Sequence, residues 1–335
     1  MSYRDIESKQ YLGRHTSLAY LTGKRNVWRR IPYLRDNDGH APPIVLAVGD
    51  RRRVYAISRR LRNPVLLPEA SAKLSNRRIS TSDLPFTAEF GRVAMAIGLV
   101  SSIPVLVVET QMGAPATQII MNEVLSDELT SIEYRVDKDR ISPPHKVVIR
   151  IGTAGGINCE DMPLLAVGDI VNATHSIGVT GSVVQSLSRL DFWRPEASEA
   201  FSTRWTSLGS AFTVTNAGHP RVECSGNVIE ALDKAGERLA KDVYRRGGNV
   251  TKDSLYAELS PDMFMQLCRT ENCRTTEMEL SAIAVAAHQH EANFGMISAI
   301  IGVLPGSSFT ESEKTKAIAE GRAVRVGLGA VKNLI

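Results

Sequence analysis

The sequence has little cysteine and no long apolar run. Its 335 residues include four cysteines, and no two of them have the C-x-x-C spacing of zinc or redox sites. Scattered thiols are typical of proteins in a reducing compartment, so we expect a cytoplasmic location. The longest apolar runs, such as residues 103–108, are far too short to cross a bilayer. We therefore expect no membrane partner.

The sequence also lacks a large excess of charge of either sign. Forty Lys and Arg residues against 36 Asp and Glu residues give a net charge of only +4, which does not suit a general nucleic-acid binder. We therefore expect no nucleic-acid partner. The basic residues are locally dense, however, with six arginines between residues 51 and 62. Such a cluster fits a solvated helix face, a nucleic-acid patch or an anion site.

From residue 44 onward, apolar stretches of strand length alternate with helical patterns, which predicts an α/β fold. No linker or shift in composition divides residues 41–335, so we expect one domain preceded by an extension over residues 1–40. Residues 135–145, 187–210 and 256–276 lack a regular pattern and are predicted to be loops. The predicted strands are 44–48, 93–97, 105–108, 146–151, 170–173, 212–215, 250–255 and 296–303, and the predicted helices are 50–62, 116–128, 226–245, 277–291 and one beginning with the capping pattern of residues 310–313.

Three of the predicted strands end in turns that contain glycine. Ligands of α/β sheets bind at the carboxyl ends of strands, and glycine lets backbone N–H groups approach them closely. None of the turns fits G-x-G-x-x-G or the Walker pattern, which argues against a dinucleotide or a nucleoside triphosphate. No H-E-x-x-H motif or EF-hand loop is present either, so we expect no metal and no cofactor. The turns are Gly49-Asp50, Gln111-Met112-Gly113-Ala114-Pro115 and Gly152-Thr153-Ala154-Gly155.

Five segments occur in the order in which one enzyme family carries similar motifs, P-G-D-P-x-R-V, G-x-G-x-P-S, R-I-G-T-x-G-x, V-G-D-V-V and E-M-E. In this sequence they are Val48-Gly49-Asp50-Arg51-Arg52-Arg53-Val54, Met112-Gly113-Ala114-Pro115, Arg150-Ile151-Gly152-Thr153-Ala154-Gly155-Gly156, Val167-Gly168-Asp169-Ile170-Val171 and Glu277-Met278-Glu279. On these segments the chain resembles the nucleoside phosphorylase-I family, and within it the uridine phosphorylases. The resemblance implies a three-layer α/β sandwich with a central mixed, partly barrel-like sheet flanked by helices.

The resemblance also implies a reaction, in which inorganic phosphate cleaves the N-glycosidic bond of a nucleoside to give ribose 1-phosphate and the free base. Phosphate is then a co-substrate, and no further cofactor is implied. Because phosphate itself attacks the sugar carbon C1′, the protein acts by positioning and by electrostatic stabilisation.

By the same resemblance, phosphate would be bound by Gly49, Arg53, Arg150 and Thr153. The planar guanidinium groups suit bidentate binding of a phosphate. An arginine donated by a neighbouring subunit is also implied, and the candidates are Arg77 and Arg78.

The ribose site is implied by the E-M-E segment. Glu279 would accept hydrogen bonds from the 2′- and 3′-hydroxyls, and Met278 would pack on the sugar, with Glu277 beside them and Met112 as a further ribose contact. Glu279 thus joins Arg53 and Arg150 as the implied catalytic residues.

The base site departs from the uridine phosphorylase pattern, because Ala257-Glu258-Leu259-Ser260 stands where a G-Q-x-R motif would read the uracil edge. Gly155, Gln266 and Arg269 are the candidate base contacts. The family's purine enzymes carry a late Asp that protonates N7, and residues 300–304 contain none. The sequence therefore favours uridine, and the alternatives are a purine nucleoside phosphorylase, a hydrolytic nucleosidase and a non-catalytic nucleoside-binding protein.

The resemblance further implies active sites shared between subunits, so that a dimer is the smallest competent unit. Many relatives are hexamers. Because the N-terminal extension and residues 187–210 would obstruct that assembly, we expect a homodimer.

Overall fold

The computed structural model describes residues 42–67, 93–125, 146–159, 162–183, 212–254, 261–305 and 312–334. They group into two compact units: unit 1 spans Met1–Gln111 and Ile119–Lys146, and unit 2 spans Met112–Gln118 and Val147–Ile335. The expected extension over residues 1–40 and the loops predicted over 135–145 and 187–210 lie outside the described residues. The single domain over residues 41–335 stays a prediction.

Unit 1 contains a small sheet with strand order β2-β3-β4-β1, in which β1 and β4 are parallel and the other pairs are antiparallel. Every residue of β1 is buried, as is usual for a strand in a parallel pair. Helix α4 packs against β3 and β4. The elements are β1 (Ile44–Val48), α4 (Arg51–Ser58), β2 (Arg62–Leu67), β3 (Met95–Val100), β4 (Ile103–Glu109) and α5 (Ala114–Leu125), whose first residues belong to unit 2.

Helix α4 begins where the sequence predicted and ends earlier. Asp50 is the N-cap, and its side chain accepts a hydrogen bond of 3.0 Å from the backbone N–H of Arg53. The predicted helix over residues 50–62 is too long, because the chain turns after Ser58 and residue 62 already begins β2. Strand β2 itself was not predicted.

Unit 2 is built on strands whose pairings close into a ring. Strand β5 is parallel to β11, β11 is antiparallel to β6, β6 is parallel to β9, β9 is parallel to β10, and β10 returns antiparallel to β5. Strands β8 and β7 extend the sheet from β6. The ring comprises β5 (Val147–Ile157), β6 (Ile170–Val179), β9 (Tyr244–Lys252), β10 (Cys273–Glu277) and β11 (Asn293–Leu304), and the extension comprises β7 (Phe212–Val214) and β8 (Pro220–Glu223).

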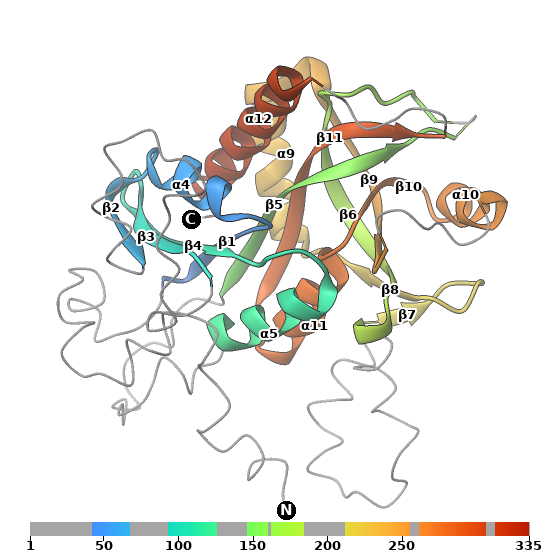
Figure 1. Ribbon diagram of the computed structural model, residues 1–335, viewed down its shortest axis with the longest axis horizontal. Coiled ribbons are helices and arrows are strands. Elements are labelled where there is room, and N and C mark those ends of the chain that lie inside the picture. The colour runs from blue at the N-terminus through green and yellow to red at the C-terminus, as the bar shows by residue number, and fades with distance from the viewer. Residues whose placement is uncertain are drawn as a thin grey trace, which may run out of the picture. The chain divides into compact units, whose positions relative to one another are not determined.

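Helices cover the ring of unit 2. Helix α12 lies beside α9 and packs on β5 and β11, while α11 contacts β5, β6, β9 and β11 (Figure 1). The predicted α/β class with a mixed, partly barrel-like sheet flanked by helices is therefore confirmed. None of the helices in the described ranges is long and apolar enough to cross a membrane. The helices are α9 (Gly226–Ala240), the 3-10 turn η5 (Lys241–Val243), α10 (Pro261–Thr270), α11 (Leu280–Gln289) and α12 (Glu313–Val331).

The glycine-rich segment after Arg150 is a strand, and the turn predicted there is wrong. Strand β5 continues to Ile157, because β11 pairs with it along its whole length and ends with Leu304 opposite Ile157. Arg150, Thr153 and Gly155 therefore lie within β5 and not at its end.

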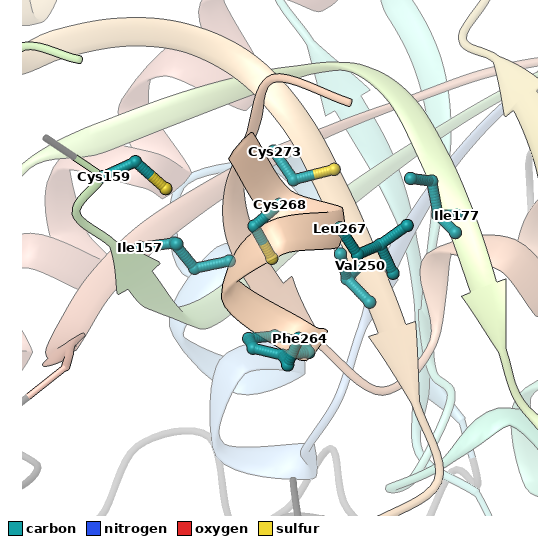
Figure 2. Close-up of a cluster of buried hydrophobic side chains, with 8 residues drawn as sticks. All are labelled: Ile157, Cys159, Ile177, Val250, Phe264, Leu267, Cys268 and Cys273. Atoms are coloured by element: carbon teal, nitrogen blue, oxygen red, sulfur yellow. The ribbon is translucent and has the colours of Figure 1, made fainter. Parts of the chain in front are cut away.

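The loop predicted over residues 256–276 is also wrong where the structure describes it, since α10 and β10 occupy residues 261–270 and 273–277. Phe264, Leu267 and Cys268 of α10 are buried and gather with side chains of β5, β6 and β9 (Figure 2). The apolar face of α10 thus covers one part of the ring. All four cysteines are free thiols and buried.

Further helix boundaries differ from the prediction. Residue 277 ends a strand, and α11 begins at Leu280. Helix α9 ends at Ala240, before the predicted residue 245, because the chain there turns into β9. Helix α12 is capped by Ser312, whose hydroxyl accepts a hydrogen bond of 3.2 Å from the N–H of Thr315, so the cap expected at residue 310 is wrong.

Candidate active site

The candidate active site of unit 2 is a buried arginine between two buried carboxylates. Arg150 lies in β5, and its Nε donates a hydrogen bond of 3.1 Å to Oε2 of Glu277. Its Nη2 donates to Oε2 of Glu279. The exposed fractions are 3% for Arg150, 6% for Glu277 and 4% for Glu279. Water therefore screens these charges weakly.

Strand pairing and helix capping bring the three side chains together. Strand β10 lies antiparallel to β5, with Thr276 opposite Gly155, and ends at Glu277. Glu279 occupies the N-cap position of α11. The guanidinium of Arg150 lies over Gly152, where a Cβ atom would be only 3.2 Å from Cζ of Arg150. The glycine of the R-I-G-T segment thus leaves room for the arginine side chain.

Glu277 is the more strongly bound carboxylate. Its oxygens accept hydrogen bonds from the backbone N–H groups of Glu279 at 2.8 Å and Leu280 at 3.0 Å, from Thr251 Oγ1 at 2.7 Å and from Asn249 Nδ2 at 2.9 Å. Burial raises the pKa of Glu277, but the charge of Arg150 and these hydrogen bonds outweigh it, so that its pKa is lowered. We therefore take Glu277 as ionised.

Glu279 has the opposite shift. Its Oε1 accepts a hydrogen bond of 2.9 Å from the N–H of Gly113, which can occupy its φ of 93° because it has no side chain. Burial raises the pKa of Glu279, and the neighbouring charge of Glu277 adds to the rise, although Arg150 opposes it. Two carboxylates on one arginine with pKa values shifted apart are typical of a functional site.

The remaining residues predicted in unit 2 lie as follows. Thr153 and Gly155 are half-buried in β5, and Met278 is half-buried between the two glutamates. Met112 is 71% exposed, next to Gly113. Gln266 and Arg269 lie on the exposed face of α10. The described residues contain no group of three or more His, Cys, Asp or Glu that could hold a metal ion.

In unit 1, Gly49 and Arg53 follow the carboxyl end of β1. Arg53 is only 8% exposed, so it does not belong to a solvated helix face, and its Nη2 lies 3.1 Å from Oδ2 of Asp50. Arg52, Arg59, Arg60 and Arg62 are exposed. The arginine cluster therefore has one buried member, Arg53, one half-buried member, Arg51, and four exposed members. Arg77 and Arg78 lie outside the described residues.

Sequence reasoning missed four polar residues at these places. Glu109 is the last residue of β4 and Thr110 follows it, and the parallel pairing of β4 with β1 puts Glu109 opposite Val48. Arg51 Nε lies 3.4 Å from Glu109 Oε2, and burial raises the pKa of this carboxyl. Asn249 and Thr251, the donors to Glu277, are fully buried in β9. Their alternate positions on either side of the buried Val250 place both side chains on one face of the strand, which is the signal that would have grouped them.

Comparisons with known proteins agree with this fold. No curated protein matches the chain. Among solved structures, it is similar to a purine nucleoside phosphorylase from Toxoplasma gondii crystallised with immucillin-H, with a TM-score of 0.58 and 18% identity over 88% of this chain and 92% of that chain. At this identity the likeness concerns the fold alone. The model of the phosphorylase superfamily matches residues 65–332, four-fifths of the sequence. The chain that carries this arginine between two glutamates therefore belongs to the phosphorylase superfamily.

Proposed function

We propose that the protein is a nucleoside phosphorylase that cleaves pyrimidine nucleosides, uridine first, with inorganic phosphate. The observation that carries the proposal is the buried guanidinium of Arg150, held by Glu277 and Glu279 in the family's own motifs. A planar cation of this kind binds phosphate through two parallel N–H groups. Phosphate attacks C1′ of the ribose, the C1′–N bond breaks, and its electron pair leaves with the base.

Arg150 and Glu279 each have a role in this reaction. Arg150 holds the phosphate and offsets its charge as the ribose ring becomes positive. Glu279 accepts hydrogen bonds from the 2′- and 3′-hydroxyls, as an ionised carboxylate can. Because Glu279 contacts Nη2 of Arg150, the ribose and the phosphate would bind next to each other. The phosphate-binding roles expected for Gly49, Arg53 and Thr153 are retained in the proposal.

The pyrimidine preference is supported by the apolar end of β11, where residues 300–304 carry no Asp that would protonate a purine N7. A purine nucleoside is the second candidate substrate. It is favoured by the missing G-Q-x-R motif and by the exposed positions of Gln266 and Arg269, the substitutes considered for uracil recognition.

The test is cleavage of uridine, thymidine and inosine, each with and without phosphate, with release of the base and of ribose 1-phosphate measured. We expect uracil release that requires phosphate. Equal release without phosphate would instead indicate a nucleosidase, cleavage of inosine alone would indicate the purine enzyme, and binding without cleavage would remove the enzymatic proposal.

A homodimer with shared active sites is also part of the proposal, as is a cytoplasmic location. Light scattering is expected to give the mass of two chains of 36.6 kDa. The mass of a hexamer would overturn the dimer.

The space above Gly152 gives a first variant of the site. In Gly152→Ala the new Cβ would lie 3.2 Å from Cζ and 3.3 Å from Nη2 of Arg150, so the guanidinium must move by a few tenths of an ångström. We expect kcat/KM for phosphate to fall about tenfold, because misplaced binding groups lose much of their effect. Steady-state kinetics at varied phosphate measures this.

Gly321→Ala in α12 is the matched control, since nothing lies within 4 Å of its added Cβ. Alanine in a helix interior stabilises by about 0.5–1 kcal/mol and should leave the kinetics unchanged. Wild-type phosphate kinetics in Gly152→Ala would mean that the position of Arg150 does not limit turnover.

A further inference from the structure

Beneath Glu277, unit 2 holds a cluster of fully buried polar side chains to which the proposed reaction gives no role. Each has an exposed fraction of 0%, and burial of such groups is costly unless they are hydrogen-bonded. They come from four different elements of the ring and its helices. The members are Ser176 of β6, Asn249 and Thr251 of β9, Thr275 of β10 and Ser281 of α11.

The hydrogen bonds of this cluster lead to one oxygen of Glu277. Thr251 Oγ1 lies 2.7 Å and Asn249 Nδ2 lies 2.9 Å from Oε1 of Glu277, whereas Arg150 Nε binds Oε2. Each carboxylate oxygen of Glu277 is therefore held by its own side-chain partners: Oε1 by Thr251 and Asn249, and Oε2 by Arg150. With the N–H groups of Glu279 and Leu280 added, the plane of the carboxylate is fixed.

The donors in the cluster are themselves oriented. Thr275 Oγ1 donates a hydrogen bond of 3.0 Å to Oδ1 of Asn249, which turns the amide nitrogen toward Glu277. An ionised carboxylate only accepts, so the single hydroxyl proton of Thr251 points to Glu277. Thr251 Oγ1 in turn accepts from the N–H of Ser281 at 3.1 Å. Ser176 Oγ lies 3.0 Å from Thr251 Oγ1 and 2.9 Å from Ser281 Oγ.

We propose that Thr251 and Asn249 are positioning residues, which fix the carboxylate of Glu277 and through it aim the guanidinium of Arg150 at the phosphate. This inference rests on the proposed function. In the proposed reaction, neither Thr251 nor Asn249 touches the substrate. Because Arg150 reaches Glu277 through Nε, a rotated carboxylate would turn the whole planar guanidinium, including the N–H groups that bind phosphate.

The test uses three threonine variants. Thr251→Val keeps the shape of the side chain and removes the hydroxyl donor, and Thr251→Ser restores that donor. Thr276→Val is the matched control, because Thr276 is a neighbouring buried threonine whose hydroxyl has no hydrogen-bond partner among the described residues. Asn249→Ala, which removes the other side-chain donor to Oε1, repeats the test if Thr251→Val does not fold.

We expect Thr251→Val to raise the KM for phosphate about tenfold, the loss that one hydrogen bond to a charged group produces. The KM for the nucleoside should stay within about twofold, since Glu279 keeps its own contact with Gly113. The acidic limb of the pH profile should move to higher pH, because Glu277 loses a donor that favours its ionised form. Thr251→Ser should return all three values toward wild type, and Thr276→Val should not change them.

A measurement without turnover separates this inference from the proposed function. In protein labelled with ¹⁵N-arginine, the Nε–H signal that disappears in Arg150→Lys belongs to Arg150. We expect it to exchange slowly with water in the wild type and in Thr276→Val, and at least about tenfold faster in Thr251→Val, which has lost a hydrogen bond to Glu277.

The outcomes are distinct. If the wild-type protein shows no phosphate-dependent cleavage, the proposed function is overturned. The exchange rate of the Arg150 Nε–H with water then still decides whether Thr251 positions Arg150. An unchanged Nε–H signal in Thr251→Val, or equal losses in the KM for phosphate and for nucleoside, would overturn the positioning role.

Discussion

We expect Arg150→Lys to lower kcat/KM for phosphate at least ~10²-fold, because a point charge replaces the planar fork that binds phosphate in the transition state. Lysine keeps a positive charge between Glu277 and Glu279, so the fold should be retained. Steady-state kinetics at varied phosphate, together with thermal unfolding, measures both effects. Arg150→Ala is less informative, since it leaves two buried carboxylates facing each other and costs about 3–5 kcal/mol of stability.

Arg246→Lys supplies the control for this substitution. Arg246 lies in β9 of the same unit, its side chain is 55% exposed, and it pairs with Asp233 at 3.4 Å. Exposed ion pairs contribute little, so neither turnover nor stability should change appreciably. Near-normal phosphate dependence in Arg150→Lys would exclude Arg150 from the phosphate site.

The second large effect is expected in Glu279→Gln, which should lower kcat/KM for the nucleoside at least ~10²-fold. Glutamine keeps the size of the side chain but loses the negative charge that accepts the ribose hydroxyls and balances the developing positive ring. A 2′-deoxynucleoside forms one hydroxyl contact fewer with Glu279, so its kcat/KM should fall by a smaller factor in this variant. Equal losses for uridine and 2′-deoxyuridine would argue that Glu279 acts elsewhere than on the ribose.

The same variant should be more stable than the wild type at neutral pH. Burial raises the pKa of Glu279 above its value in the unfolded chain, so wild-type stability is lost as the pH rises through the folded pKa. Glutamine does not titrate. The Tm of Glu279→Gln should therefore exceed that of the wild type by a margin that grows as the pH rises above the pKa of a glutamate in the unfolded chain. A margin that shrinks with rising pH would contradict the raised pKa.

Local sequence rules predicted part of the local structure correctly. Asp50 caps α4 as its position before an apolar helical pattern indicated, and β1 has its predicted bounds. The resemblance of the motifs to those of a known family selected Arg150, Glu277 and Glu279, and the structure brings these three side chains into contact. Such features depend on residues near one another in the chain, and their signals survive in a single sequence.

Features that depend on distant partners were not predicted. Because glycines are common in turns, local sequence rules predict a turn for the R-I-G-T segment. The segment is a strand because it pairs with β11, which lies more than a hundred residues later in the chain. Helix α10 was not predicted, because its apolar residues pack against the ring of strands and that contact is not visible in the local sequence. Asn249 and Thr251 were overlooked, since nothing in β9 itself indicates the carboxylate that they bind.

The sequence by itself determined the α/β class and the capping of α4 by Asp50, because periodicity and capping are set by neighbours along the chain, and it carries the motifs by which the chain resembles a known family. Only the tertiary structure decided that the strands of unit 2 close into a ring, because closure depends on pairings between segments far apart. It also decided that Arg53 is buried while other arginines of its cluster are exposed, and that Glu277 and Glu279 differ in pKa. Burial and hydrogen-bond partners set those properties, and both arise only when the chain has folded.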